Sequence, residues 1–227
     1  MVSVVADLIY ILAIARKDAL QEWRSRAATV ATVFFAANVL VILAFAFSAQ
    51  RDLLALIGPG ALWVALAFSG VISAAQSYRS ELDEGALEHL LLYPIPRSSI
   101  FLGKLLANWG YMALLGLFLL VATAIFFGLA LNLFPWLVLT LLLGTLGFSL
   151  IATFYAALTA NLRARESLLP VLMFPVVVPI LLAAVRATGE LAADNRAFAL
   201  DWLQLLLGFD LVYAVVCTAI FHFVMEE

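Results

Sequence analysis

The sequence predicts an all-α polytopic membrane protein with six transmembrane helices, an N-terminal interfacial helix and a cytoplasmic helix after the second crossing. Apolar residues make up 66% of the chain and charged residues only 12%. Charge-free runs of bilayer length recur along it, and basic residues gather in alternate loops. A soluble domain of 227 residues would need far more polar surface, so residues 1–227 are predicted to form a single transmembrane domain.

The N-terminal segment, residues 1–26, predicts a helix that lies in the membrane interface. Trp23 would sit at headgroup depth, and Arg24 and Arg26 would face anionic lipid. A simple cytoplasmic lead-in to the first crossing is the alternative.

The six crossings follow from charge-free runs, with breaks at polar, glycine and proline residues. Residues 27–50 would form about 36 Å of helix, which is enough for one crossing. Gly58-Pro59-Gly60 is expected to divide the next run into an interfacial piece and a crossing. The charge-free run 105–162 is too long for one helix, so Asn132 and Pro135 are assigned to a hairpin turn. The predicted crossings are 27–50, 61–77, 106–130, 135–160, 167–185 and 202–224, and residues 186–201 form an external loop with room for a short helix.

The fifth predicted crossing carries Pro170, Pro175 and Pro179. Each proline removes a backbone donor, so this helix is expected to be bent or interrupted and to face protein on all sides. Pro175 and Pro179 are therefore candidates for an intramembrane cavity.

The loop charges predict the orientation. Six crossings leave both termini on one side, together with the loops 78–105 and 163–166. That side carries nine basic residues, namely Arg16, Lys17, Arg24, Arg26, Arg79, Arg97, Lys104, Arg163 and Arg165, whereas the other carries only Arg51, Arg186 and Arg196. The positive-inside rule then places both termini in the cytoplasm. Trp63, Trp136 and Trp202 are expected near the outer interface.

The longest polar interruption is the loop 78–105, which is expected to bind any partner in the aqueous phase. Ser80 and Asp83 have the spacing of a capping box, which predicts that a helix begins here. Apolar residues recur on one face of this helix and acidic residues lie elsewhere, until Pro94 and Pro96 end it. The apolar residues are Leu82, Ala86, Leu87 and Leu90, and the acidic residues are Glu81, Glu84 and Glu88. Such a helix can dock in a groove of another protein; an amphipathic loop helix with no partner is the alternative.

These features carry a family resemblance. The layout resembles the permease subunits of ABC-2 type exporters, in which this loop is the coupling helix that docks on the ATPase. Six sequence segments look like the haem exporter protein B family (CcmB type) of cytochrome c maturation. They are Leu56–Val64, Leu82–Leu90, Pro94-Ile95-Pro96, Lys104–Trp109, Leu139–Thr145 and Phe174–Pro179.

The resemblance implies a multi-pass protein of the bacterial cytoplasmic (inner) membrane that acts as a homodimer. Its implied partners are an ABC ATPase subunit and the haem-handling subunits of the same system. The residues implied to couple to the ATPase are Glu81, Leu82, Asp83, Glu84, Leu87, Glu88, Leu90 and Leu91, with Pro94 and Pro96 at the turn.

The chain has no P-loop, because Gly103-Lys104 is preceded at the required spacing by Ser98. We therefore expect a non-catalytic subunit that uses ATP only through a partner. The only histidines, His89 and His222, fall on the cytoplasmic side, so the chain is not expected to bind haem as a cofactor, although haem is a candidate substrate. A net charge of −3 gives no indication of nucleic-acid binding.

Asp210 lies about 12 Å along the last crossing from Trp202. An ionisable residue at this depth usually faces the bundle interior. It is expected to line a dimer cavity or to pair with Arg186; a tilted helix that leaves it at the headgroups is the alternative.

Three functions fit the sequence. The first is an ABC permease subunit for haem export or release of a haem chaperone in cytochrome c maturation. The second is an ABC-2 exporter permease for another substrate, such as a lipid or drug. The third is an ion-coupled secondary transporter, suggested by the prolines of the fifth crossing.

Overall fold

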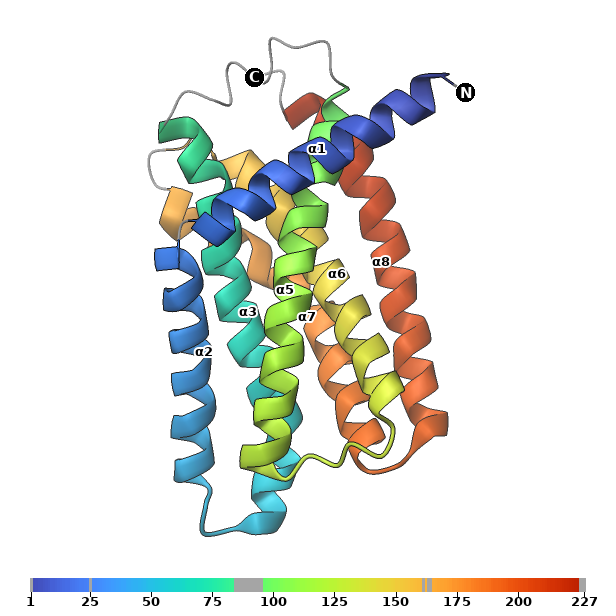
Figure 1. Cartoon of the computed structure of the whole chain (residues 1–227). Coiled ribbons are helices and arrows are strands. Elements are labelled where there is room, and N and C mark those ends of the chain that lie inside the picture. Colours follow the sequence, from blue (N-terminus) through green and yellow to red (C-terminus); the bar gives the residue numbers. More distant parts are fainter. Residues whose placement is uncertain (1, 25, 84–95, 161, 163–164, 225–227) are drawn as a thin grey trace.

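The chain is an all-helical, multi-pass membrane protein in its computed structural model, which describes residues 2–24, 26–83, 96–160, 162 and 165–224 (Figure 1). Within these residues the helices are α1 (Val2–Arg24), α2 (Arg26–Ala46), α3 (Arg51–Asp83), α5 (Arg97–Phe127), α6 (Phe134–Thr159), α7 (Arg165–Ala192) and α8 (Arg196–Val224). Each helix from α2 to α8 is long and apolar enough to cross a membrane, which gives the six predicted crossings.

The helix α1 lies across one end of the bundle instead of running along it, and it packs on α5 (Figure 1). The C-terminal end of α3, the start of α5 and the end of α8 lie at this same end. The opposite end holds the connections at residues 47–50, 128–133 and 193–195. Gly128 ends α5 in the left-handed conformation, with φ of 69°, and Pro135 occupies the first turn of α6. The hairpin predicted around Asn132 and Pro135 is therefore present.

The helix α3 differs from prediction at both ends. Gly58-Pro59-Gly60 does not divide the run, because α3 continues through Pro59 from Arg51 to Asp83. Pro59 is buried among neighbouring helices, where a proline is tolerated in a membrane helix. The helix start predicted at Ser80 is also wrong, since Ser80 lies inside α3. The spacing of a capping box can also occur inside a helix, when the helix has already begun before the first residue of the box.

The predicted external loop 186–201 is mostly helical. The helix α7 runs to Ala192 and α8 begins at Arg196, so only residues 193–195 connect them. Glu190 stabilises this turn, because its backbone carbonyl accepts the Asn195 N–H at 2.8 Å and its carboxylate accepts the Asn195 side-chain amide at 2.9 Å.

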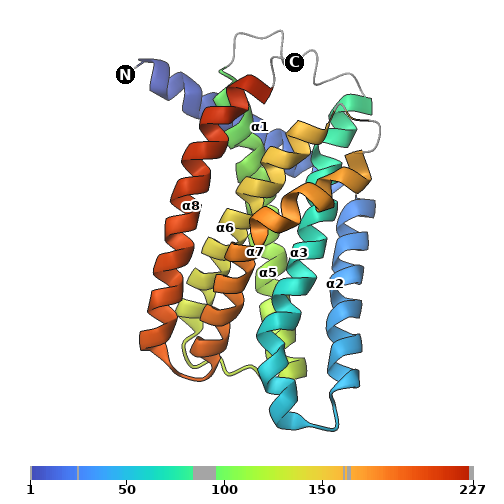
Figure 2. The same cartoon turned by 180° about the vertical axis from the view of Figure 1, so that it is seen from behind.

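The helix α7 is continuous and bent, as its three prolines predicted, and the bend is visible in Figure 2. The Tyr213 hydroxyl of α8 donates to the Val176 carbonyl at 3.1 Å, three residues before Pro179. A neighbouring helix thus supplies a donor inside the proline segment, although the carbonyl that Pro179 leaves without its helical donor is that of Pro175. The expectation that this helix faces protein on all sides is wrong for the single chain, because Val171, Val178 and Leu182 are exposed.

The buried core takes side chains from all six membrane-spanning helices, and α3, α6 and α7 meet around Trp63. Trp63 was expected at the outer interface but is buried, and its indole N–H donates to Thr188 Oγ1 at 2.9 Å. Gly144 of α6 makes room for the ring, since a Cβ at this position would clash with it. Trp136, in the first turn of α6, is half-buried, and the Arg196 guanidinium lies 4.5 Å from its ring centroid.

Candidate functional site

The predicted coupling residues lie at the α1 end of the bundle. Glu81, Leu82 and Asp83 form the last turn of α3, and Pro96 is the N-cap of α5. The remaining predicted coupling residues, Glu84, Leu87, Glu88, Leu90, Leu91 and Pro94, lie outside the described part of the chain. The described flanks therefore define where this segment enters and leaves the bundle.

The first turns of α5 are anchored in the bundle. Pro96 has a φ of −57° and a ψ of 132°, and its carbonyl accepts the Ser99 N–H at 2.9 Å. Ile100 and Phe101 are buried, and the Phe101 ring lies 4.9 Å from the Phe221 ring of α8. The start of α5 is thus joined to α8 through this aromatic pair.

The helix α1 is bound to α5 by a buried ion pair that the sequence did not suggest. The Lys104 ammonium lies 3.2 Å from Asp18 Oδ2, and the two side chains are 0% and 10% exposed. One residue earlier, Gly103 lets α1 approach closely, because a Cβ there would lie 2.8 Å from Ile14. Lys104 and Asp18 are 86 positions apart in the sequence, so only the tertiary fold brings them together.

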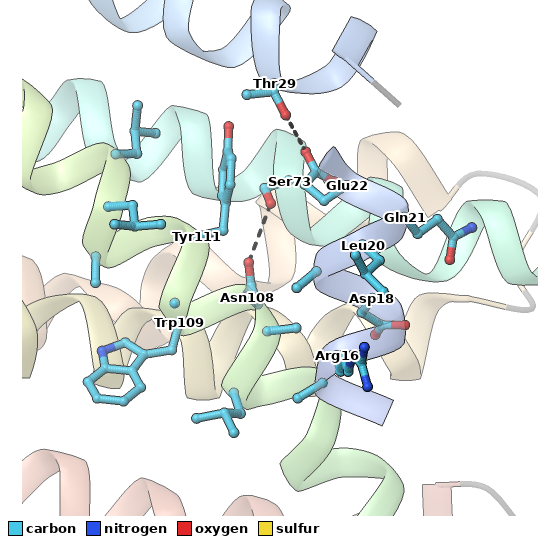
Figure 3. A pocket seen from close by; sticks show the side chains of 18 of the residues that line it. Arg16, Asp18, Leu20, Gln21, Glu22, Thr29, Ser73, Asn108, Trp109 and Tyr111 are labelled. Atoms are coloured by element: carbon cyan, nitrogen blue, oxygen red, sulfur yellow. Dashed lines mark hydrogen bonds between the residues drawn. The ribbon is translucent and has the colours of Figure 1, made fainter. Parts of the chain in front are cut away.

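A buried polar seam continues along α5 from Lys104 through Asn108 to Tyr111, at helical spacing. The Asn108 amide donates to Thr153 of α6 at 3.2 Å, and Asn108 Oδ1 accepts the Ser73 hydroxyl of α3 at 3.5 Å (Figure 3). The Tyr111 hydroxyl is hydrogen-bonded to Thr32 of α2. The seam therefore links four crossings in the half of the bundle nearest α1.

Beside the seam a cavity of about 1610 Å³ opens between α1, α2, α3 and α5. Its polar wall includes Arg16 and Glu22 from α1 and Asn108 from α5, and its apolar wall includes Leu114 and Phe118. The Glu22 carboxylate accepts the Thr29 hydroxyl at 3.0 Å across the mouth (Figure 3). We call this cavity the α1 groove.

Asp210 lies inside the bundle, not at the headgroups, because it is only 3% exposed. Its carboxylate contacts Gly147 of α6, and Ile180 of α7 approaches the same glycine. Neither carboxylate oxygen has a hydrogen-bond partner in the described residues, so the expected pairing with Arg186 is absent and Arg186 is exposed. Within one chain Asp210 faces the junction of α6, α7 and α8 instead of an open cavity.

The cavity candidates Pro175 and Pro179 do not line the α1 groove, whose described lining comes from α1, α2, α3, α5 and Leu142 of α6. Pro175 is exposed and Pro179 half-buried on α7. The structure therefore does not bring the intramembrane candidates together with the groove. In the described residues no group of three or more His, Cys, Asp or Glu side chains is arranged to hold a metal ion.

Comparison with known proteins identifies the family. The sequence model of the CcmB protein family matches residues 9–225. The chain belongs to the CcmB family. It is 33% identical to heme exporter protein B of Pseudomonas aeruginosa over an aligned region of 162 residues, and this region covers 71% of each chain. It is 34% identical over 159 residues to heme exporter protein B of Paracoccus denitrificans, which covers 68% of this chain and 71% of the relative. The heme exporter protein B of Haemophilus influenzae is 33% identical over 161 residues, or 71% of this chain and 73% of the relative.

The CcmB family match includes almost every structural feature described above. It begins within α1 and ends just beyond α8, so the six crossings, the α1 groove and the segment between α3 and α5 all fall inside it. The resemblance drawn from the sequence words is therefore confirmed for the chain as a whole.

Proposed function

We propose that this chain is the permease subunit of an ABC transporter that serves haem export or haem-chaperone release in cytochrome c maturation. The observation that carries the proposal is the CcmB family match across all six crossings. The similar relatives are named heme exporter protein B, so an exporter for a lipid or drug and an ion-coupled secondary transporter are not favoured. In this role haem is the transported substrate and the chain itself is non-catalytic.

A separate ATPase subunit would dock on the segment between α3 and α5. This assignment is supported by the position of the flanks, because Asp83 and Pro96 both lie at the α1 end (Figure 1). The apolar positions Leu87 and Leu90 are the expected contacts. Motion of the segment would pass to α5, and through Lys104 and Asp18 to α1.

The α1 end is proposed to face the cytoplasm of a bacterium, with the protein in the inner membrane. Among the described residues, Arg16, Lys17, Arg97 and Lys104 belong to this end, whereas Arg51, Arg186 and Arg196 belong to the other. The positive-inside rule supports this orientation, which leaves both termini cytoplasmic.

The working assembly is proposed to contain two copies of the chain, the ATPase and haem-handling subunits. A single bundle of six helices has a packed core, with Trp63 and Phe148 buried, and is too filled for a wide pore. The exposed apolar faces of α2, α7 and α8 leave surface for a second copy and for lipid.

Co-purification tests the docking assignment. The tagged chain should bring down a P-loop ATPase, and Leu87→Asp or Leu90→Asp should abolish this by placing an unpaired charge in an apolar contact. The matched control is Leu131→Asp, the same change at an exposed position at the opposite end of the bundle. Recovery of the ATPase with both loop variants, or no ATPase with the unaltered chain, would refute the assignment.

A further inference from the structure

The α1 groove has two chemically different parts. Its mouth carries the Arg16 side chain, which is exposed and makes no ion pair with any described residue. Below the mouth the wall follows α5, where Leu114 is 72% exposed and Phe118 is 55% exposed. These two residues are four positions apart and share a helix face. Asp18 and Glu22 also line the groove, but Asp18 pairs with Lys17 and Lys104 and Glu22 accepts the Thr29 hydroxyl. The groove thus joins the Arg16 guanidinium to an apolar strip that continues along the bundle surface.

The polar groups deeper in the groove are already occupied. Asn108 bonds Ser73 and Thr153, and the Tyr111 hydroxyl bonds Thr32. The Trp109 indole N–H donates to the Leu142 carbonyl at 3.1 Å. Because these groups are satisfied within the chain, recognition by the groove depends on the guanidinium at its mouth and the apolar wall below.

An occupant must therefore combine an anionic head with long apolar tails. Haem fits this description less well, because the described lining contains no His, Cys or Met to bind its iron and Tyr111 is engaged. A partner helix would leave Arg16 facing an apolar surface. A phospholipid fits both parts, since acyl chains adapt to the strip and the phosphate can pair with the guanidinium in a bidentate manner.

We propose that the α1 groove is a binding site for one anionic phospholipid, with its phosphate at Arg16 and its acyl chains against Leu114 and Phe118. The site lies beside the ion pair between Asp18 and Lys104, so the lipid would contact the helix pair that receives motion from the segment between α3 and α5. The binding itself does not depend on the proposed export of haem.

Native mass spectrometry of the full chain tests this site. The protein is released from nanodiscs that contain equal amounts of phosphatidylglycerol and phosphatidylcholine. The unaltered chain should retain one phosphatidylglycerol in preference to phosphatidylcholine, and Arg16→Gln should lower that preference about fivefold, the effect expected for one basic residue near a membrane surface. Arg186→Gln, the same change at an exposed arginine at the other end, should leave it unchanged.

Four results would overturn the proposal. The first is equal retention of the two lipids by the unaltered chain, and the second is an equal loss of preference in Arg16→Gln and Arg186→Gln. The third is cross-linking of two Leu114→Cys copies to each other in nanodiscs, which would assign the groove to a contact between copies. The fourth is displacement of phosphatidylglycerol by added haemin, together with a Soret band that is lost in Arg16→Gln. This result would identify haem instead of a phospholipid as the occupant.

Discussion

The pair between Asp18 and Lys104 gives the sharpest test of how α1 is held. In Asp18→Asn the Lys104 ammonium loses a carboxylate 3.2 Å away, in a site where the two side chains are 0% and 10% exposed. Removing one member of a buried ion pair costs about 3–5 kcal/mol, because the remaining charge is poorly solvated. Asp18 also pairs with Lys17 at 3.0 Å and Lys104 has a further interaction, so we expect a smaller cost of about 2 kcal/mol, which is a fall in Tm of roughly 4–8 °C for a chain of this size.

The assay is thermal unfolding of the purified full chain in detergent, followed by tryptophan fluorescence. Asp201→Asn, the same change at an exposed position of α8, should shift Tm by less than about 2 °C. An Asp18→Asn protein with the Tm of the unaltered chain would refute this reasoning.

Three further changes test the core. Gly147→Val should lower stability by about 1–3 kcal/mol and reduce the yield of folded protein, because its Cβ would meet Ile180 at 2.7 Å and overlap Asp210; unchanged yield and Tm would contradict this packing. Trp63→Phe should lower Tm by a few degrees through loss of the hydrogen bond to Thr188 and of ring volume, and Thr188→Val should account for only part of the fall. Asp210→Asn should raise Tm, because an uncharged side chain of the same shape costs less to bury without partners; a fall would mean that the carboxylate has a partner in the protein as purified.

The number of crossings could be predicted because hydrocarbon thickness and charge exclusion act on local sequence. The charge-free run 105–162 is longer than any single crossing, so its division into α5 and α6 at Asn132 and Pro135 required no tertiary information. The proline-bent α7 was predictable for the same reason, since the missing backbone donors are local.

The errors arose where tertiary packing overrides a local signal. Pro59 reads as a break, yet α3 continues through it because neighbouring helices surround that turn. Trp63 reads as an interface anchor, yet Thr188, 125 positions away, supplies a buried hydrogen-bond acceptor. The Asp18 to Lys104 pair and the α1 groove likewise join separate helices, and no spacing within one helix could have indicated them.

The central claim is that the segment between α3 and α5 contacts a nucleotide-hydrolysing partner. Its most direct test is photo-cross-linking in cells that carry the complete system, with a photoreactive amino acid in place of Leu87 and, as the control, in place of Leu131 at the opposite end of the bundle. The account predicts an adduct between position 87 and a P-loop ATPase, and none from position 131. An ATPase adduct from position 131 but not from position 87 would contradict it.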